Sequence, residues 1–98
     1  MTRDEVLSKL KAVEPALRAR GVGALYLFGS YARDEARPDS DVDVFIDPAN
    51  DDAYRFENFM GAHDILQEAL DGRVDYGTRN GLSKYARPDI EQEAIRVF

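Results

Sequence analysis

Three short apolar segments, separated by helical stretches, constrain the fold of this chain more than any other feature of the sequence. Each apolar segment has the length of a strand, and the stretches around them show helical periodicity or capping signals. The expected strands are 24–28, 41–47 and 73–77, and the expected helices lie in about 2–20, 30–36, 52–70 and 82–98. This alternation predicts an α/β domain whose sheet is covered by helices. It leaves open whether neighbouring strands are parallel or antiparallel.

Local signals place several of the helix ends. Thr2 and Glu5 have the spacing of a capping box at the start of the first helix. Pro15 should kink that helix or split it in two, and Gly21 should end it. We expect Pro88 to break the helical tail in a similar way.

Size and composition exclude several classes of protein. A length of 98 residues predicts one domain covering 1–98. The formal net charge is −6, whereas proteins that bind nucleic acid backbones usually carry a basic face, so we expect no direct nucleic acid binding. The absence of cysteine excludes disulfides and thiolate metal sites. Without a signal-peptide core or an apolar run of membrane-spanning length, we expect a soluble, cytoplasmic protein that makes no membrane contact.

Asp41 and Asp43 stand two residues apart in a strand whose interior otherwise consists of Val, Phe and Ile. Residues i and i+2 of a strand point to the same side, so these carboxylates lie close together and repel each other unless a cation separates them. Mg²⁺ prefers oxygen ligands and is commonly held by one or two carboxylates together with substrate phosphates. Asp75, on the third expected strand, could add a third carboxylate, and three would suit two metal ions. The pattern therefore predicts a magnesium site.

Gly29 and Ser30 end the first expected strand and begin a short helix. A glycine at such a turn lets the backbone approach a ligand closely, and the N–H groups of a helix start favour phosphate. Ser30 adds a hydroxyl, and Arg33, one turn later, could reach the same phosphates. A phosphate site followed by a carboxylate pair predicts a nucleoside triphosphate bound with its metal. The Walker A sequence and the three-glycine dinucleotide fingerprint are both absent.

Residues 29–47, GSYARDEARPDSDVDVFID, resemble the signature of the minimal nucleotidyltransferases, small members of the DNA polymerase beta-like superfamily. That signature is Gly-Ser, ten residues and then Asp-x-Asp, which the chain matches at 29–30 and 41–43. The third carboxylate of the family lies on a later strand, where Asp75 fits. The chain departs from the common form at Asp34, where glycine is frequent. The resemblance implies a single small nucleotidyltransferase-fold domain with a mixed sheet of three or four strands.

The resemblance also implies Mg²⁺-dependent transfer of AMP from ATP to an acceptor hydroxyl, with release of pyrophosphate. Gly29 and Ser30 would hold the triphosphate, Asp41 and Asp43 would bind Mg²⁺, and Asp75 would complete the site and help to deprotonate the acceptor. Many such proteins are antitoxins that act beside a HEPN-domain ribonuclease toxin, and some add AMP to a tyrosine of that toxin. We therefore expect two Mg²⁺ ions, ATP as substrate, and a hetero-oligomer with a cognate HEPN-type toxin.

Two other functions stay open on the sequence alone. The protein could be a non-catalytic antitoxin, a binding module that neutralises its partner by complex formation and keeps only a vestigial nucleotide pocket. It could also modify a small molecule, although such enzymes usually need a second domain around the acceptor. Dependence of the activity on ATP and on Asp41 separates the enzyme from the binding module.

Individual residues also have simpler interpretations. The three aspartates could be solvent-exposed strand residues. Arg33 could form a surface salt bridge with a neighbouring acidic residue such as Asp34 or Glu35. Asp47 fits a strand end or a turn better than a metal site.

Overall fold

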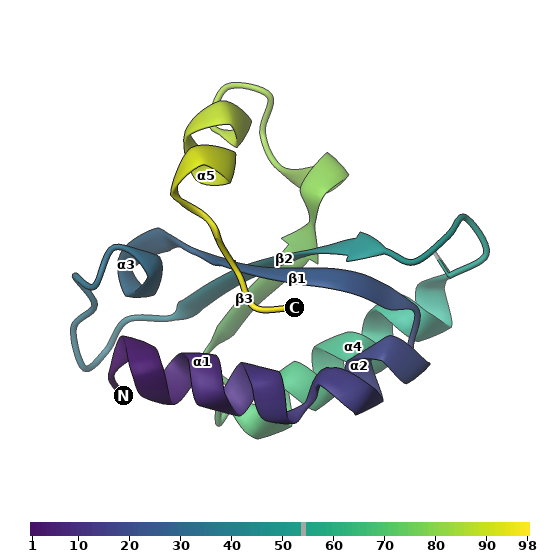
Figure 1. Cartoon of the computed structure of the whole chain (residues 1–98), viewed down its shortest axis with the longest axis horizontal. Coiled ribbons are helices and arrows are strands. Elements are labelled where there is room, and N and C mark those ends of the chain that lie inside the picture. The colour runs from purple at the N-terminus through teal and green to yellow at the C-terminus, as the bar shows by residue number, and fades with distance from the viewer. Residues whose placement is uncertain (54) are drawn as a thin grey trace.

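The computed structural model describes residues 1–53 and 55–98, which form a four-stranded sheet with helices on both faces (Figure 1). The strands are β1 (Val22–Phe28), β2 (Val42–Pro48), β3 (Val74–Thr78) and β4 (Ile95–Arg96). The helices are α1 (Arg3–Ala12), α2 (Glu14–Ala19), α3 (Gly29–Ala32), α4 (Phe56–Ala69), the 3-10 helix η1 (Arg79–Gly81) and α5 (Arg87–Glu93). This arrangement confirms the predicted α/β fold class.

The sheet is mixed and has the strand order β3-β2-β1-β4. β1 pairs with β2 and with β4 in the antiparallel sense, whereas β2 and β3 are parallel. A parallel pair needs a crossover connection, and α4 supplies it. β4 lies in the tail that the sequence predicted to be helical only. With two residues, β4 is too short to produce a clear alternation of apolar and polar positions.

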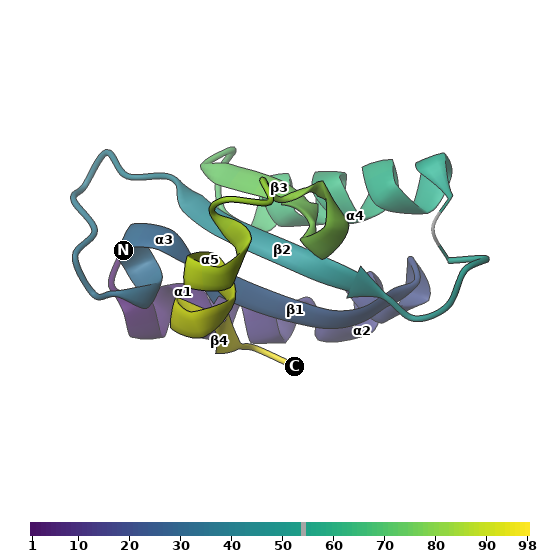
Figure 2. The same cartoon turned by 90° about the horizontal axis from the view of Figure 1, so that it is seen from above.

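The core lies between the sheet and the layer formed by α1, α2 and α4, which Figure 1 shows below the strands. Val42, Val44 and Ile46 belong to this core, as the alternation in β2 predicts, and each is buried. Leu10 of α1 and Leu66 of α4 are fully buried in the same cluster. α5 lies over the opposite face of the sheet, as the view from above shows (Figure 2). That opposite face carries the polar side chains of β2.

The observed helix ends follow the predicted signals. Thr2 caps α1, because its side chain accepts a hydrogen bond of 3.1 Å from the Glu5 backbone N–H. Pro15 lies in the first turn of α2, where proline is tolerated, so the predicted break divides the segment into two helices. Gly21 follows α2 with a φ of +84°, a conformation that glycine adopts readily.

α4 begins at Phe56, later than the predicted start near Asp52, and residues 49–53 form bends and turns instead. Tyr54, which the prediction included in this helix, lies outside the described residues. Phe56 was expected on the apolar face, but it is 74% exposed, whereas Leu66 is fully buried. No helix in the described part of the chain, α4 included, is long and apolar enough to cross a membrane.

Candidate active site

The three predicted carboxylates gather at one end of β2. Asp43 lies opposite Phe28 of β1 and opposite Asp75 of β3 in the strand registers. Asp41 directly precedes the first residue of β2. Asp43 is half-buried, whereas Asp41 and Asp75 are exposed. Strand pairing therefore brings Asp43 and Asp75 side by side, next to the end of β1.

Asp43 has a pKa that the fold raises strongly. Burial, followed by the negative charges of Asp75 and Asp41, raises the pKa of Asp43 from 3.8 to about 6. The positive charge of Arg33 opposes this change, and the negative charge of Glu93 adds to it. Within 1–53 and 55–98, the salt bridges include none of the three aspartates. A cation bound here would relieve the repulsion that raises the pKa of Asp43.

Gly29 leaves the space that the Asp43 carboxylate occupies. The φ of Gly29 is +75°, and a Cβ on this residue would lie 2.2 Å from Asp43 Oδ2. Any other residue would therefore clash with the carboxylate, so glycine lets the start of α3 lie directly beside it. α3 has only four residues, so the free N–H groups of its first turn, rather than a long helix dipole, are what it offers to an anion.

Glu93, at the end of α5, completes this region, although no local pattern in the sequence indicated its role. Its carboxylate accepts a 3.0 Å hydrogen bond from the Gly29 backbone N–H. It also accepts hydrogen bonds from Arg33 Nη1, at 3.0 Å and 3.3 Å to its two oxygens. Arg33 forms the surface salt bridge with Glu35 that was one of its predicted interpretations, and Glu93 is a second partner. β4, the strand that follows Glu93, has only two residues, so no alternating pattern marked this position in the sequence.

Asp47, on the same face of β2 as Asp43, has a different environment. Arg79 donates two hydrogen bonds of 2.9 Å to the Asp47 carboxylate. The Arg79 guanidinium also lies over the rings of Tyr26 and Phe45, at 4.9 Å and 5.0 Å from their centroids. The charge of Asp47 is thus compensated within the protein, as expected for a strand-end residue, whereas the charge of Asp43 has mostly negative neighbours.

The chemistry of the carboxylate group suits a divalent cation, although its members are not drawn into a compact cluster. Carboxylate oxygens are the ligands that Mg²⁺ prefers, and the raised pKa of Asp43 reflects its burial and then the negative charges of Asp75 and Asp41. In the part of the chain that the structure describes, no three Asp, Glu or His side chains lie close enough together to hold a metal ion. The predicted pair of Mg²⁺ ions, with Asp75 as a third ligand, stays a prediction.

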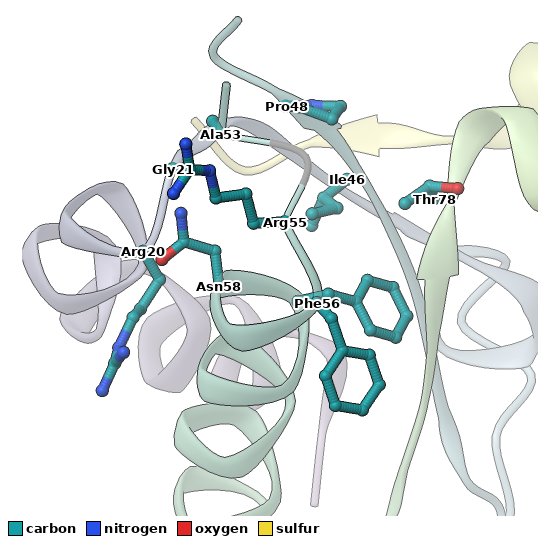
Figure 3. A pocket seen from close by; sticks show the side chains of 10 residues that line it. Arg20, Gly21, Ile46, Pro48, Ala53, Arg55, Phe56, Asn58 and Thr78 are labelled. Atoms are coloured by element: carbon teal, nitrogen blue, oxygen red, sulfur yellow. The ribbon is translucent and has the colours of Figure 1, made fainter. Parts of the chain in front are cut away.

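A separate pocket of about 380 Å³ lies near the other end of β2 (Figure 3). It is lined by Arg20, Gly21, Ile46, Pro48, Ala53, Arg55, Phe56, Asn58, Phe59 and Thr78. Arg55 extends from the segment before α4 toward Gly21 and Ala53. Ile46 points to the helix-covered face of the sheet, and Asp43 points to the opposite face. The pocket is therefore separate from the carboxylate site.

Comparison with known proteins decides the family. The family described as "Nucleotidyltransferase domain" matches residues 7–97, which is most of the chain. The chain belongs to the nucleotidyltransferase domain family. The resemblance of residues 29–47 to that family is thereby confirmed over nearly the whole sequence, and so is the expected enzyme class, a nucleotidyltransferase.

Relatives of this nucleotidyltransferase include proteins with a named activity. It is 33% identical to the protein adenylyltransferase MntA of Thermococcus cleftensis, over 99% of this chain and 97% of that protein. A solved structure described as a minimal nucleotidyltransferase has a TM-score of 0.81 at 28% identity, covering 97% of this chain and 95% of that chain. The tri-AMPylated Shewanella oneidensis HEPN toxin in complex with MNT antitoxin gives a TM-score of 0.63 at 19% identity, covering 99% of this chain and 72% of that chain. This last likeness concerns the fold.

Proposed function

We propose that this nucleotidyltransferase transfers AMP from ATP to a tyrosine hydroxyl of a HEPN-type toxin, in the cytoplasm, as a single domain covering 1–98. The relative from Thermococcus cleftensis is named a protein adenylyltransferase, which supports a protein acceptor. The structural neighbour that contains a tri-AMPylated HEPN toxin together with an MNT antitoxin supports the class of partner. In this role the chain is an antitoxin that forms a hetero-oligomer with its target.

The observation that carries the proposal is the position of Asp43. A half-buried carboxylate, flanked by two further aspartates, lies directly beside the glycine that begins α3. Anionic oxygens and free backbone N–H groups at one place are the two halves of a site for a metal-bound triphosphate. The spacing of Gly-Ser and Asp-x-Asp in the sequence matches this juxtaposition.

Each site residue has a role in the proposed reaction. Asp41 and Asp43 would hold Mg²⁺, which when bound neutralises charge on the phosphates and activates them toward attack. Gly29 and Ser30 would hold the triphosphate in place. The acceptor oxygen forms a bond to the α-phosphorus, the bond from that phosphorus to the bridging oxygen breaks, and pyrophosphate leaves. Asp75 would take up the proton of the acceptor hydroxyl.

Arg33 has a less direct place in the proposed site. It is exposed, and its Nε and Nη1 are bound to Glu35 and Glu93, so a phosphate could take these two donors only if Arg33 changed partners. The alternative function is a non-catalytic antitoxin that neutralises its partner by complex formation alone. No contact in the described residues favours that alternative over transfer, and the two differ in their dependence on ATP.

Intact-mass spectrometry of the chain mixed with its candidate toxin and Mg²⁺-ATP tests the proposal. We expect the toxin to gain one or more AMP units with the wild-type chain and none with Asp41→Asn or Asp43→Asn. Asp47→Asn is the matched control, because it makes the same change on the same strand at a carboxylate that Arg79 already neutralises. A stable complex with unchanged masses would support the binding module instead.

A further inference from the structure

We infer that Glu93 occupies two hydrogen-bond donors of the triphosphate site, the Gly29 backbone N–H and Arg33 Nη1, so that a nucleotide must displace this carboxylate before its phosphates can use them. The inference rests on the proposed function, because it takes Gly29 and Arg33 as donors to a triphosphate. On this inference Glu93, near the C-terminal end of the sequence, lowers the affinity of the site for its nucleotide.

The contacts of Glu93 coincide with those donors. Glu93 Oε1 accepts hydrogen bonds from the Gly29 backbone N–H at 3.0 Å and from Arg33 Nη1 at 3.3 Å, and Oε2 accepts from Arg33 Nη1 at 3.0 Å. A backbone amide has one hydrogen to donate. A phosphate oxygen can therefore take the Gly29 N–H only after Glu93 has moved away from it.

The sheet holds the backbone of Glu93 at this place. β4 pairs with β1 in a register that sets Ile95 opposite Leu27. Glu93 lies two residues before Ile95 and Gly29 two residues after Leu27, so this pairing brings the end of α5 next to the start of α3. Glu93 is also the last residue of α5, an end at which the helix dipole does not favour a negative charge. Its stabilising partners are therefore the donors of Gly29 and Arg33, rather than its own helix.

The charges in this region indicate that Glu93 competes with a phosphate for these donors and does not help to bind it. Glu93 adds a negative charge to the surroundings of Asp43 and contributes to the raised pKa of that residue. A triphosphate is itself anionic, so it and Glu93 would repel each other at one set of donors. The side chains of Arg33 and Glu93 are 46% and 26% exposed. Solvent can therefore reach this ion pair, and the two side chains can separate at a modest cost in free energy.

Two other roles for Glu93 predict the opposite effect on nucleotide affinity. Glu93 could orient Arg33 toward a phosphate, or it could be a ligand of the metal ion. In both cases, removal of its charge weakens nucleotide binding. If Glu93 competes with the triphosphate, removal of its charge strengthens binding, and the sign of the change distinguishes these roles.

Isothermal titration calorimetry of the full chain measures this sign, with Mg²⁺-ATP and inorganic tripolyphosphate as separate probes. Glu93→Gln removes the charge and keeps the size of the side chain, and Glu93→Asp withdraws the carboxylate by one methylene group. Glu91→Gln is the matched control, because it removes the same charge from the same helix at a residue that pairs with Arg79. Circular dichroism shows whether each variant is folded. If Glu93→Gln does not fold, the binding measured with Glu93→Asp tests the inference instead.

We expect Glu93→Gln to bind both probes roughly 10-fold more tightly than the wild type. The reason is that the nucleotide-free state, in which residue 93 is bound to Gly29 and Arg33, loses a charge-assisted hydrogen bond. Glu93→Asp should change in the same direction, and Glu91→Gln should stay within about 2-fold of the wild type. Unchanged or weaker binding by the Glu93 variants overturns the inference. Equal tightening by Glu91→Gln also overturns it, in favour of a general effect of charge.

Failure of the proposed function would look different. If Mg²⁺-ATP binds neither the wild type nor any variant, the nucleotide site and the competition inferred for it both fall. If the wild type binds Mg²⁺-ATP and transfers AMP, but the Glu93 variants bind no more tightly, only the inference about Glu93 falls.

Discussion

Asp43 Oδ2 occupies the space that a Cβ on Gly29 would need, at a distance of 2.2 Å. This contact joins the two halves of the Gly-Ser and Asp-x-Asp pattern. β1 ends at Phe28, directly opposite Asp43 in the antiparallel register, so the residue after β1 reaches the carboxylate of the neighbouring strand. The ten residues between the two halves contain the rest of α3 and the loop that returns the chain to the sheet.

Gly29→Ala should destabilise the fold and displace the Asp43 carboxylate. The substitution adds a Cβ clash to a φ of +75° that disfavours alanine, so we expect a loss of at least about 2 kcal/mol in the free energy of unfolding. Gly77→Ala is the control, since a Cβ on Gly77 would meet nothing within 4 Å, and we expect a change within about 0.5 kcal/mol. Urea unfolding measures both values, and equal losses would contradict the assigned contact.

Asp43→Asn should make the metal-free protein more stable at pH 7 while abolishing AMP transfer. The asparagine keeps the shape of the side chain and removes a half-buried charge that lies near Asp41 and Asp75. We expect a gain of about 1 kcal/mol, a value that allows for solvent screening of a half-buried group. Thermal unfolding in EDTA measures this gain. A loss of stability would mean that the Asp43 charge is compensated in the folded protein.

The contribution of Asp43 to stability should also depend on pH. Its pKa is raised to about 6 in the folded protein from 3.8 in the unfolded chain, so the folded state binds more protons between these values. The stability of the wild type relative to Asp43→Asn should therefore fall as the pH rises from about 4 to about 6, and then level off. Unfolding curves of both proteins from pH 3.5 to 8 give the difference directly, and a difference that rises over this interval would contradict the raised pKa.

Arg79→Lys should reduce stability without affecting metal binding. Lysine keeps the positive charge but loses the paired hydrogen bonds to Asp47 and the stacking on Tyr26 and Phe45. We expect a loss of about 1–2 kcal/mol in the free energy of unfolding. Arg96→Lys serves as the control, because Arg96 is exposed and lies 6.0 Å from the Tyr26 centroid, and its effect should be within about 0.5 kcal/mol. A larger effect at Arg96 than at Arg79 would show that the Asp47 pair is not structural.

Local patterns in the sequence predicted the features that depend on neighbouring residues. The alternation in 41–47 placed Asp43 and the buried valines of β2 on opposite faces, because side chains of a strand alternate wherever the strand lies in the sheet. The end of the first strand at Gly29 was also predicted from the local sequence, and the φ of Gly29 there is +75°, a conformation that glycine adopts readily.

Features that depend on distant parts of the chain could not be predicted in this way. The parallel pairing of β2 with β3 is decided by how α4 packs across the sheet. Glu93 reaches Gly29 across 64 residues, through the pairing of β4 with the edge of β1. A two-residue strand has too few positions for an alternating pattern, so neither β4 nor the carboxylate that it positions stood out in the sequence.

In the proposed reaction, Asp41 and Asp43, beside Gly29, hold the metal and its nucleotide. The most direct measurement is a crystal structure of the protein with Mn²⁺ and a non-hydrolysable ATP analogue, in which anomalous scattering locates the metal. We expect an Mn²⁺ peak at about 2.2 Å from carboxylate oxygens of Asp41 and Asp43, with the phosphates next to Gly29 and Ser30. A nucleotide bound instead in the pocket near Arg55 and Phe56, with no metal at Asp43, would contradict this expectation.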